Sequence, residues 1–265
     1  MPLTATPPNR LLVELCAGGI EDVILAAAHE VDRIELNSGM TVGGLTPSAG
    51  LVAGSRKIFS GPIIAMVRPR EGGFAYSKAE YLQMLNDSEL LLDAGLDGIA
   101  TGFLTSAGTV DVERCRKLRT LLPGAFLVFH KAFDVTEDPD IALSQLIECG
   151  FNRILTSGGM PTAIEGAAIL KRLHEKAVGR IEILPAGSIR ASNVLALVSQ
   201  TACDQIHSAV RGKAIDLSTQ RNSRIQFGLP GNDSTTYGSA SANQLQELLC
   251  AVQHLRLPES GGHGS

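Results

Sequence analysis

Eight short apolar runs alternate with stretches of helical periodicity, and this alternation constrains the fold more than any other feature of the chain. The runs expected to be strands span 11–17, 33–37, 62–70, 98–104, 125–132, 153–158, 181–187 and 205–210. The stretches expected to be helices span 20–30, 47–58, 77–95, 111–122, 138–149, 162–178 and 191–201. Strands that alternate with helices in this way predict a parallel sheet.

A closed barrel and an open doubly wound sheet both show this alternation. The count of eight, the length of 265 residues and the absence of a composition break favour the barrel, which typically needs about 250 residues. We therefore predict an α/β protein with a single-domain (β/α)8 TIM barrel over 10–257 and flexible tails at 1–9 and 258–265. A Gly/Ser/Thr-rich segment at 228–243 is expected to be a loop before a last helix at about 243–256.

Composition and charge argue against several classes of protein. The net charge is −4 and no basic stretch is present, which argues against nucleic-acid binding. No apolar run reaches 18 uncharged residues and the N-terminus has no apolar leader, so we expect neither a membrane span nor a secretory signal. Five scattered cysteines without a CxxC pair predict free thiols in a reducing compartment. We expect a cytoplasmic protein, or a nuclear one if the source is eukaryotic.

Ionisable residues lie on one face of several predicted strands. In AFLVFHKAFD (125–134), two-residue alternation puts His130 and Asp134 on one face and Lys131 on the other. One face of a barrel strand points at the axis, and its C-terminal end faces the usual active-site position. The acid–base candidates on that face are Glu14, Glu35, His130, Asp134 and His207.

Buried charges must be paired or hydrogen-bonded, which predicts contacts among these side chains. We expect one network at the C-terminal end of the barrel, made of Glu14, Glu35, Arg68 and His130. A structural interpretation remains open for each of them. A Glu–Arg pair can fill a barrel without any function, and His207 can be a hydrogen-bonded core residue.

A second group of residues has the chemistry to hold an anion. Arg68 and Arg70 end the third predicted strand, and guanidinium groups bind carboxylate or phosphate oxygens in pairs. The segment PAGSIRASN (185–193) follows the seventh strand and opens a helix, where backbone N–H groups can hold a phosphate. The anion-binding candidates are Arg68, Arg70, Ser157, Gly158, Gly187 and Ser188.

Seven strand-end motifs follow one another in the order VELCA, RIELN, GGLTPS, RPREGGFAY, FHKAFD, RILTSGG and IHSAVRG. Together they resemble the CutC family of copper-homeostasis barrels over about residues 11–224. The resemblance implies a cytoplasmic (β/α)8 protein that forms a homo-oligomer, a dimer or a tetramer, and binds Cu(I).

The chain departs from the pattern of that family at several positions. Cys16 matches the first of two family cysteines and is the candidate metal ligand, but Asn37 stands at the second. The chain also reads RPREGGF where RPRGGDF is common, and it has Lys131 where Arg is usual. Since thiolate is the preferred Cu(I) ligand, we predict weaker Cu(I) binding than in relatives with both cysteines.

Three functions are consistent with the sequence. The resemblance favours a protein that binds and handles Cu(I). The residue chemistry favours a metal-independent enzyme of lyase or isomerase type acting on a small anionic substrate, with Arg68 binding the anion and His130 as acid or base. The third is an interaction scaffold built on an inactive barrel, because this fold does not determine function.

Overall fold

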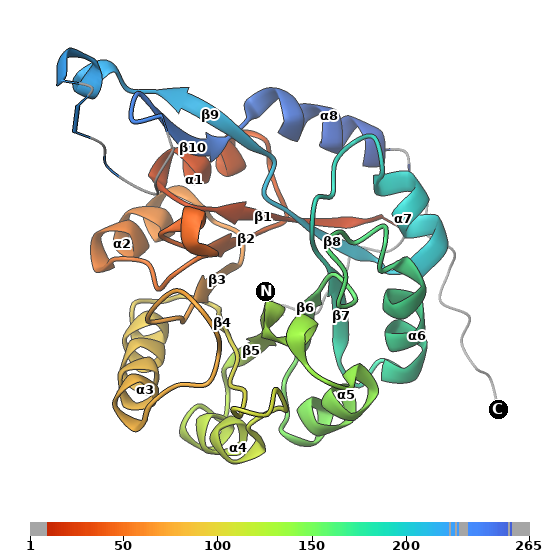
Figure 1. Cartoon of the computed structure of the whole chain (residues 1–265). Coiled ribbons are helices and arrows are strands. Elements are labelled where there is room, and N and C mark those ends of the chain that lie inside the picture. Colours follow the sequence, from red (N-terminus) through yellow and green to blue (C-terminus); the bar gives the residue numbers. More distant parts are fainter. Residues whose placement is uncertain (1–9, 223, 226, 228–232, 254, 256–265) are drawn as a thin grey trace.

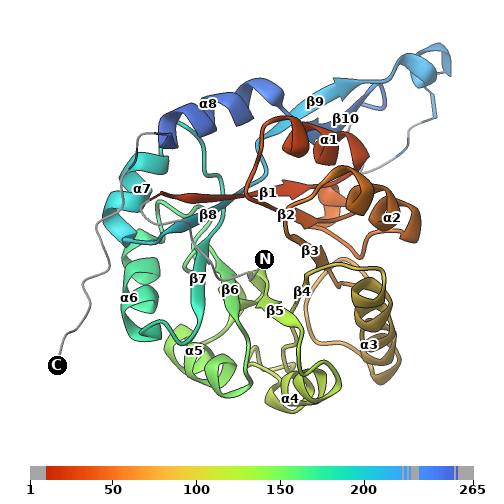
Figure 2. The same ribbon diagram turned by 180° about the vertical axis from the view of Figure 1, so that it is seen from behind.

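Eight parallel strands form a barrel surrounded by helices (Figure 1, and from behind in Figure 2). The computed structural model describes residues 10–222, 224–225, 227, 233–253 and 255. Its sheet has the order β7-β6-β5-β4-β3-β2-β1-β8, and a parallel bridge between Ala186 and His207 joins the two ends. The predicted (β/α)8 fold is confirmed. The tails expected at 1–9 and 258–265 lie outside the described residues.

All eight predicted strands and all the predicted helices are present. The barrel strands are β1 (Leu12–Ala17), β2 (Arg33–Leu36), β3 (Ile63–Met66), β4 (Gly98–Thr101), β5 (Phe126–Phe129), β6 (Arg153–Thr156), β7 (Glu182–Pro185) and β8 (Gln205–Ser208). The helices are α1 (Ile20–Ala28), α2 (Ala49–Ile58), α3 (Lys78–Asp93), α4 (Val112–Leu121), α5 (Pro139–Glu148), α6 (Ala167–Ala177), α7 (Val194–Thr201) and α8 (Ala242–Val252). Short 3-10 turns are η1 (Met40–Val42), η2 (Lys131–Val135) and η3 (Leu217–Asn222).

Side-chain caps begin several helices where the sequence indicates a start. Ser77 accepts a hydrogen bond from the backbone of Glu80, and the Glu80 carboxylate accepts one from the backbone of Ser77. Asp138 caps α5, and Pro139 occupies its first turn. These caps satisfy N–H groups that have no partner inside the helix. None of the helices in the described ranges is long and apolar enough to cross a membrane.

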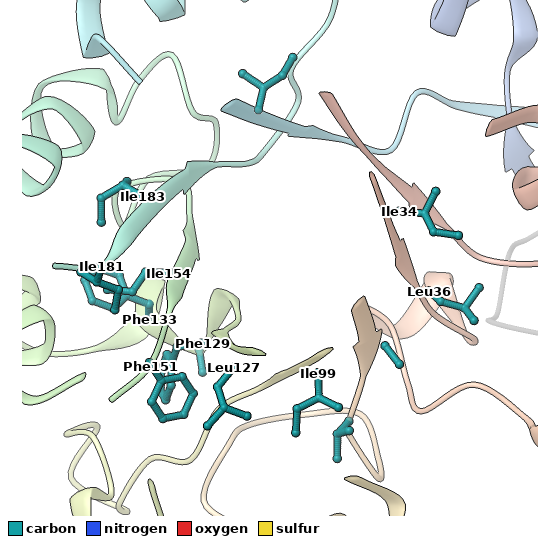
Figure 3. Packing of buried hydrophobic residues seen from close by; sticks show 14 of the residues in the cluster. Ile34, Leu36, Ile99, Leu127, Phe129, Phe133, Phe151, Ile154, Ile181 and Ile183 are labelled. Atoms are coloured by element: carbon teal, nitrogen blue, oxygen red, sulfur yellow. The ribbon is translucent and has the colours of Figure 1, made fainter. Parts of the chain in front are cut away.

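Two-residue alternation along the strands separates two apolar layers. Ile34, Leu36 and Leu127 point outward into the larger cluster between the sheet and the helices (Figure 3). A smaller cluster inside the barrel includes Met66 and Leu155. Buried polar side chains occupy the rest of the interior, and they position the site described below.

An antiparallel hairpin of β9 (Arg211–Ile215) and β10 (Thr236–Ala240) extends beyond the ring of helices (Figures 1 and 2). The loop expected at 228–243 is therefore wrong over its described part, which holds β10 and the start of α8. The Gly- and Ser-rich composition of this segment does not indicate a strand, and β10 is stabilised by pairing with β9. Asp22 of α1 fixes this strand, because its carboxylate accepts from Ser239 Oγ and from the backbone of Ala240.

Candidate functional site

A buried ionic network fills part of the barrel interior. The Arg33 guanidinium, on β2, pairs through Nε with the Glu14 carboxylate of β1 and donates from Nη2 to Gln205 Oε1 at 2.9 Å. Arg153 on β6 lies 3.8 Å from Glu14 Oε2 and pairs with Glu182 at 2.5 Å. Burial would raise the pKa of Glu14, but the Arg33 charge holds it well below its ordinary value. Burial also lowers the pKa of Arg153 to about 10.

His207 on β8 connects this network to a second carboxylate. Its Nδ1 lies 2.7 Å from Glu14 Oε1, and its Nε2 lies 3.9 Å from Glu35 Oε2 on β2. Burial opposes a charged imidazole, but the neighbouring Glu35 and Glu14 carboxylates raise the pKa of His207 well above its ordinary value. The Glu14 contact assigns the hydrogen to Nδ1 when the ring is neutral, so that Nε2 is the nitrogen with a lone pair for a ligand.

Sulfur atoms lie beside this histidine. Cys16 Sγ, at the end of β1, lies 3.7 Å from Glu35 Oε2 and 3.9 Å from Met40 Sδ. Asn37 Nδ2 lies 3.5 Å from the same sulfur and donates to Glu35 Oε2 at 2.9 Å. Burial raises the pKa of Cys16, so the thiol is protonated at neutral pH. One ligand atom from each of Cys16, Glu35 and His207 lies within 4.8 Å of the others, close enough to hold one metal ion.

These side chains form one wall of a cavity of about 550 Å³ at the C-terminal end of the barrel. Its lining includes eight of the residues predicted from the sequence, namely Cys16, Glu35, Arg68, His130, Asp134, Gly187, Ser188 and His207. Glu14 is not part of the lining and lies behind His207. The remaining lining includes Met40, Met66, Phe74, Leu155 and Arg190, which makes the cavity partly apolar.

The predicted network of Glu14, Glu35, Arg68 and His130 is wrong in its choice of cation. Arg68 donates to the backbone carbonyls of Val42, Gly44 and Gly72 at 2.8–2.9 Å and pairs with no carboxylate among the described residues. Arg33 and Arg153 pair with Glu14 instead. Arg33 lies two residues before Glu35 on β2, so two-residue alternation places it on the same axis-facing side. This pattern could have identified Arg33 as a residue of the barrel interior.

His130 follows β5, is buried and faces the ring of Phe74, with ring centroids 5.0 Å apart. Its Nδ1 accepts from the backbone N–H of Ala132 at 3.2 Å, so the neutral ring carries its hydrogen on Nε2. Burial and the Arg68 charge lower the pKa of His130 to about 3. This histidine is therefore neutral at pH 7, and its Nε2–H has no acceptor among the described residues.

The turn η2 begins directly after His130 and contains Lys131 and Asp134, so the two-residue alternation of β5 no longer applies to them. Lys131 was expected on the opposite face, but in η2 it reaches the cavity, where Nζ lies 2.8 Å from Asp134 Oδ2 and 2.9 Å from Ser157 Oγ. Asp134 also accepts from Thr156 Oγ1 and from the backbone N–H groups of Ser157 and Gly159. Asp134 thus holds the loop after β6, and its hydrogen bonds leave it little capacity as a free base.

Three predicted anion-binding residues do not line the cavity. Arg70 turns away from it and pairs with Glu80, while its guanidinium lies 5.0 Å from the ring of Tyr76. Ser157 donates from Oγ to the backbone carbonyl of Met160 and forms part of the loop behind Lys131. Gly158 has a φ of +73° and lies against Gly166, a close approach that requires glycine.

The chain is similar to proteins of one family over most of its length. The family model described as the CutC family matches residues 11–212. A CutC family protein of Treponema denticola is 45% identical over 220 residues, which are 83% of this chain and 89% of that protein. The copper homeostasis protein cutC homolog of Homo sapiens is 37% identical over 83% of this chain and 81% of its own length. A CutC crystal structure from Streptococcus agalactiae has a TM-score of 0.71 and 33% identity, and the match covers 74% of this chain and 97% of that one.

Proposed function

Because the chain belongs to the CutC family, we propose that it binds Cu(I) and takes part in copper homeostasis, with the ion held at the Cys16 end of the cavity. The observation that carries this proposal is the grouping of Cys16, Glu35 and His207 ligand atoms within 4.8 Å. The matched relatives favour this function over the lyase or isomerase alternative. The ion is cargo in this proposal, and the cavity gives it access to solvent.

The donor set of this cluster suits a soft ion. Thiolate and thioether sulfur select Cu(I), and imidazole is a good additional ligand. Cys16 supplies a thiolate when Cu(I) displaces its proton, Met40 Sδ lies 3.9 Å from the Cys16 sulfur, and His207 presents Nε2. Glu14 holds Nδ1 of His207 at 2.7 Å and orients the ring, as carboxylates behind metal-bound histidines do.

Asn37 occupies the position at which the family pattern has a second cysteine. Its amide donates to Glu35 and lies 3.5 Å from Cys16 Sγ, so a thiolate at this position would lie beside the first. We therefore expect Asn37→Cys to increase the affinity for Cu(I). Met40 gives the present chain a second sulfur, but a neutral one that binds Cu(I) less strongly than a thiolate.

Competitive titration against a Cu(I) chelator under anaerobic, reducing conditions tests this function. The wild-type chain should withdraw one equivalent of Cu(I), Cys16→Ser should withdraw none, and Asn37→Cys should compete better than the wild type. Cys203→Ser is the matched control, since Cys203 is also buried but lies outside the cavity. Tight binding that survives Cys16→Ser contradicts the ligand assignment.

We also propose that the protein forms a homo-oligomer in the cytoplasm. Apolar side chains on the β9–β10 hairpin and the segment between its strands are exposed, namely Ile215, Leu217, Ile225, Phe227 and Tyr237. Five exposed apolar side chains on one segment are the support for an interface at this place. Sedimentation should give a dimer or tetramer, and Ile215→Ser with Phe227→Ser should shift it toward the monomer. The free cysteines support a reducing compartment, which imaging of the tagged protein tests.

A further inference from the structure

Two buried donors on the far wall of the cavity have no acceptor among the described residues. They are His130 Nε2 and Arg68 Nε, and both side chains are more than nine-tenths buried. Both side chains line the cavity and both contact Phe74, whose ring lies 5.4 Å from Arg68 Cζ and 5.0 Å from the His130 ring. Buried donors are rarely left without a partner in native proteins, so these two indicate a missing acceptor.

The charge on this wall is also uncompensated. Arg68 donates three of its N–H groups to backbone carbonyls, which orient the guanidinium but do not neutralise it. Arg190, from the loop after β7, donates to the carbonyl of Ile189 and forms no ion pair within the described ranges. Lys131 differs, since Asp134 pairs with it at 2.8 Å. The carboxylates in the cavity lining, Glu35 and Asp134, lie beside His207 and Lys131, so neither guanidinium is paired with a carboxylate among the described residues.

We propose that this wall binds a small organic oxyanion, a carboxylate or a phosphate ester, through Arg68, His130 and Arg190. The acid oxygens accept from the neutral His130 Nε2–H and from Arg68 Nε–H, while Arg190 supplies charge at the mouth. Met66, Phe74 and Leu155 offer apolar contact to the body of the ligand. His130 suits this role because its Nδ1 is committed to the backbone of Ala132, which leaves Nε2–H as its free donor.

The oxyanion site and the proposed Cu(I) site share one cavity but use different residues. Arg68 and His130 follow β3 and β5, and Arg190 follows β7, whereas Cys16 and His207 lie on β1 and β8. In the sheet order, β5 lies four strands from β1, while β3 neighbours β2 and a bridge between Ala186 and His207 joins the end of β7 to β8. Failure of Cu(I) binding therefore leaves the oxyanion proposal intact, and the reverse holds as well.

Calorimetric titration of copper-free protein tests the proposal with three probes that share a phenyl ring and differ in their polar group. They are benzoate, phenyl phosphate and neutral benzyl alcohol. We expect one of the two anions to bind and the alcohol not to bind, and the anion that binds identifies the acid group. Arg190→Met and His130→Phe should each weaken binding about 10- to 100-fold, the usual effect of losing a hydrogen bond to a charged group.

Arg116→Met is the matched control, because it removes an arginine that is exposed and outside the cavity. It should leave the affinity unchanged. Thermal unfolding of each variant first shows that it is folded, and the Arg190 variant keeps the test valid if His130→Phe does not fold. The proposal is overturned if neither anion binds, if the alcohol binds equally well, or if the folded cavity variants bind as tightly as the wild type.

Discussion

Replacing Arg33 by methionine should destabilise the protein severely. The Arg33 side chain is almost fully buried, pairs with Glu14 and donates to Gln205 at 2.9 Å. Methionine fills a similar volume but leaves Glu14 with only His207 and the more distant Arg153. Breaking a buried ion pair from one side costs roughly 3–5 kcal/mol, because the remaining charge stays out of water.

Thermal and urea unfolding give the magnitude of this effect. For a domain of this size, each kcal/mol lowers the melting temperature by roughly 2–4 °C, so Arg33→Met should lower it by roughly 6–20 °C. The control is Arg116→Met, since Arg116 forms an exposed pair with Glu148 at 3.6 Å. Exposed pairs contribute less than about 1 kcal/mol.

A double-mutant cycle separates the pair from the loss of packing. Glu14→Gln leaves Arg33 without its carboxylate, while the double variant removes both charges together. The double variant should therefore be more stable than the sum of the two single effects predicts, by roughly 0.5–3 kcal/mol. Additive effects, or an unchanged melting temperature in Arg33→Met, would show that the two side chains do not form a coupled buried pair.

Three further outcomes follow from the structure. Met40→Leu should weaken Cu(I) binding without lowering stability, since it removes a thioether 3.9 Å from Cys16 Sγ and keeps the volume; equal affinity in a chelator competition would exclude Met40 as a ligand. Gly187→Ala should destabilise by roughly 1–3 kcal/mol, because Gly187 has a φ of +111° and a Cβ would lie 3.2 Å from Ser157 Cβ; urea unfolding measures this, and a neutral result would contradict the backbone geometry. The pKa of His130 is about 3 in the folded protein and about 6.5 when unfolded, so the unfolded state binds more protons between these values. Stability should therefore decrease as the pH is lowered, by about 2 kcal/mol from pH 7.5 to pH 5. His207, whose pKa is raised, contributes the opposite slope over this range, so the measurement is the difference between wild type and His130→Gln, and equal pH profiles would refute a buried neutral His130.

The barrel was predictable from sequence because each of its eight strands and the helices between them carry a local signal. The β9–β10 hairpin was missed because β10 has the composition of a loop and depends on β9 and on Asp22. Two-residue alternation also found part of the cavity lining, since it decides which strand side chains face the axis. Alternation cannot be relied on beyond the end of a strand, which explains why Lys131, in η2, reaches the cavity although it was expected on the opposite face.

Which interior side chains pair with one another was harder to predict than which side chains point toward the barrel axis. Arg68 and Arg33 both lie on the inner side, but only the three-dimensional register places Arg33 against Glu14 and Arg68 against the carbonyls of the loops. The contact of Met40 with Cys16 depends on the turn after β2, for which the sequence has no periodic signal. Residues in regular strands were therefore assigned correctly more often than residues in the loops at their ends.

Crystals loaded with Cu(I) under anaerobic conditions give the most direct test of the proposed function. Anomalous diffraction at the copper absorption edge locates the ion without any assumption about its ligands. The account predicts one strong peak within bonding distance of Cys16 Sγ and His207 Nε2, and no such peak in crystals of Cys16→Ser. A peak located elsewhere, for example at the exposed Cys250, or no peak at all in the wild-type protein, would contradict the proposed copper site.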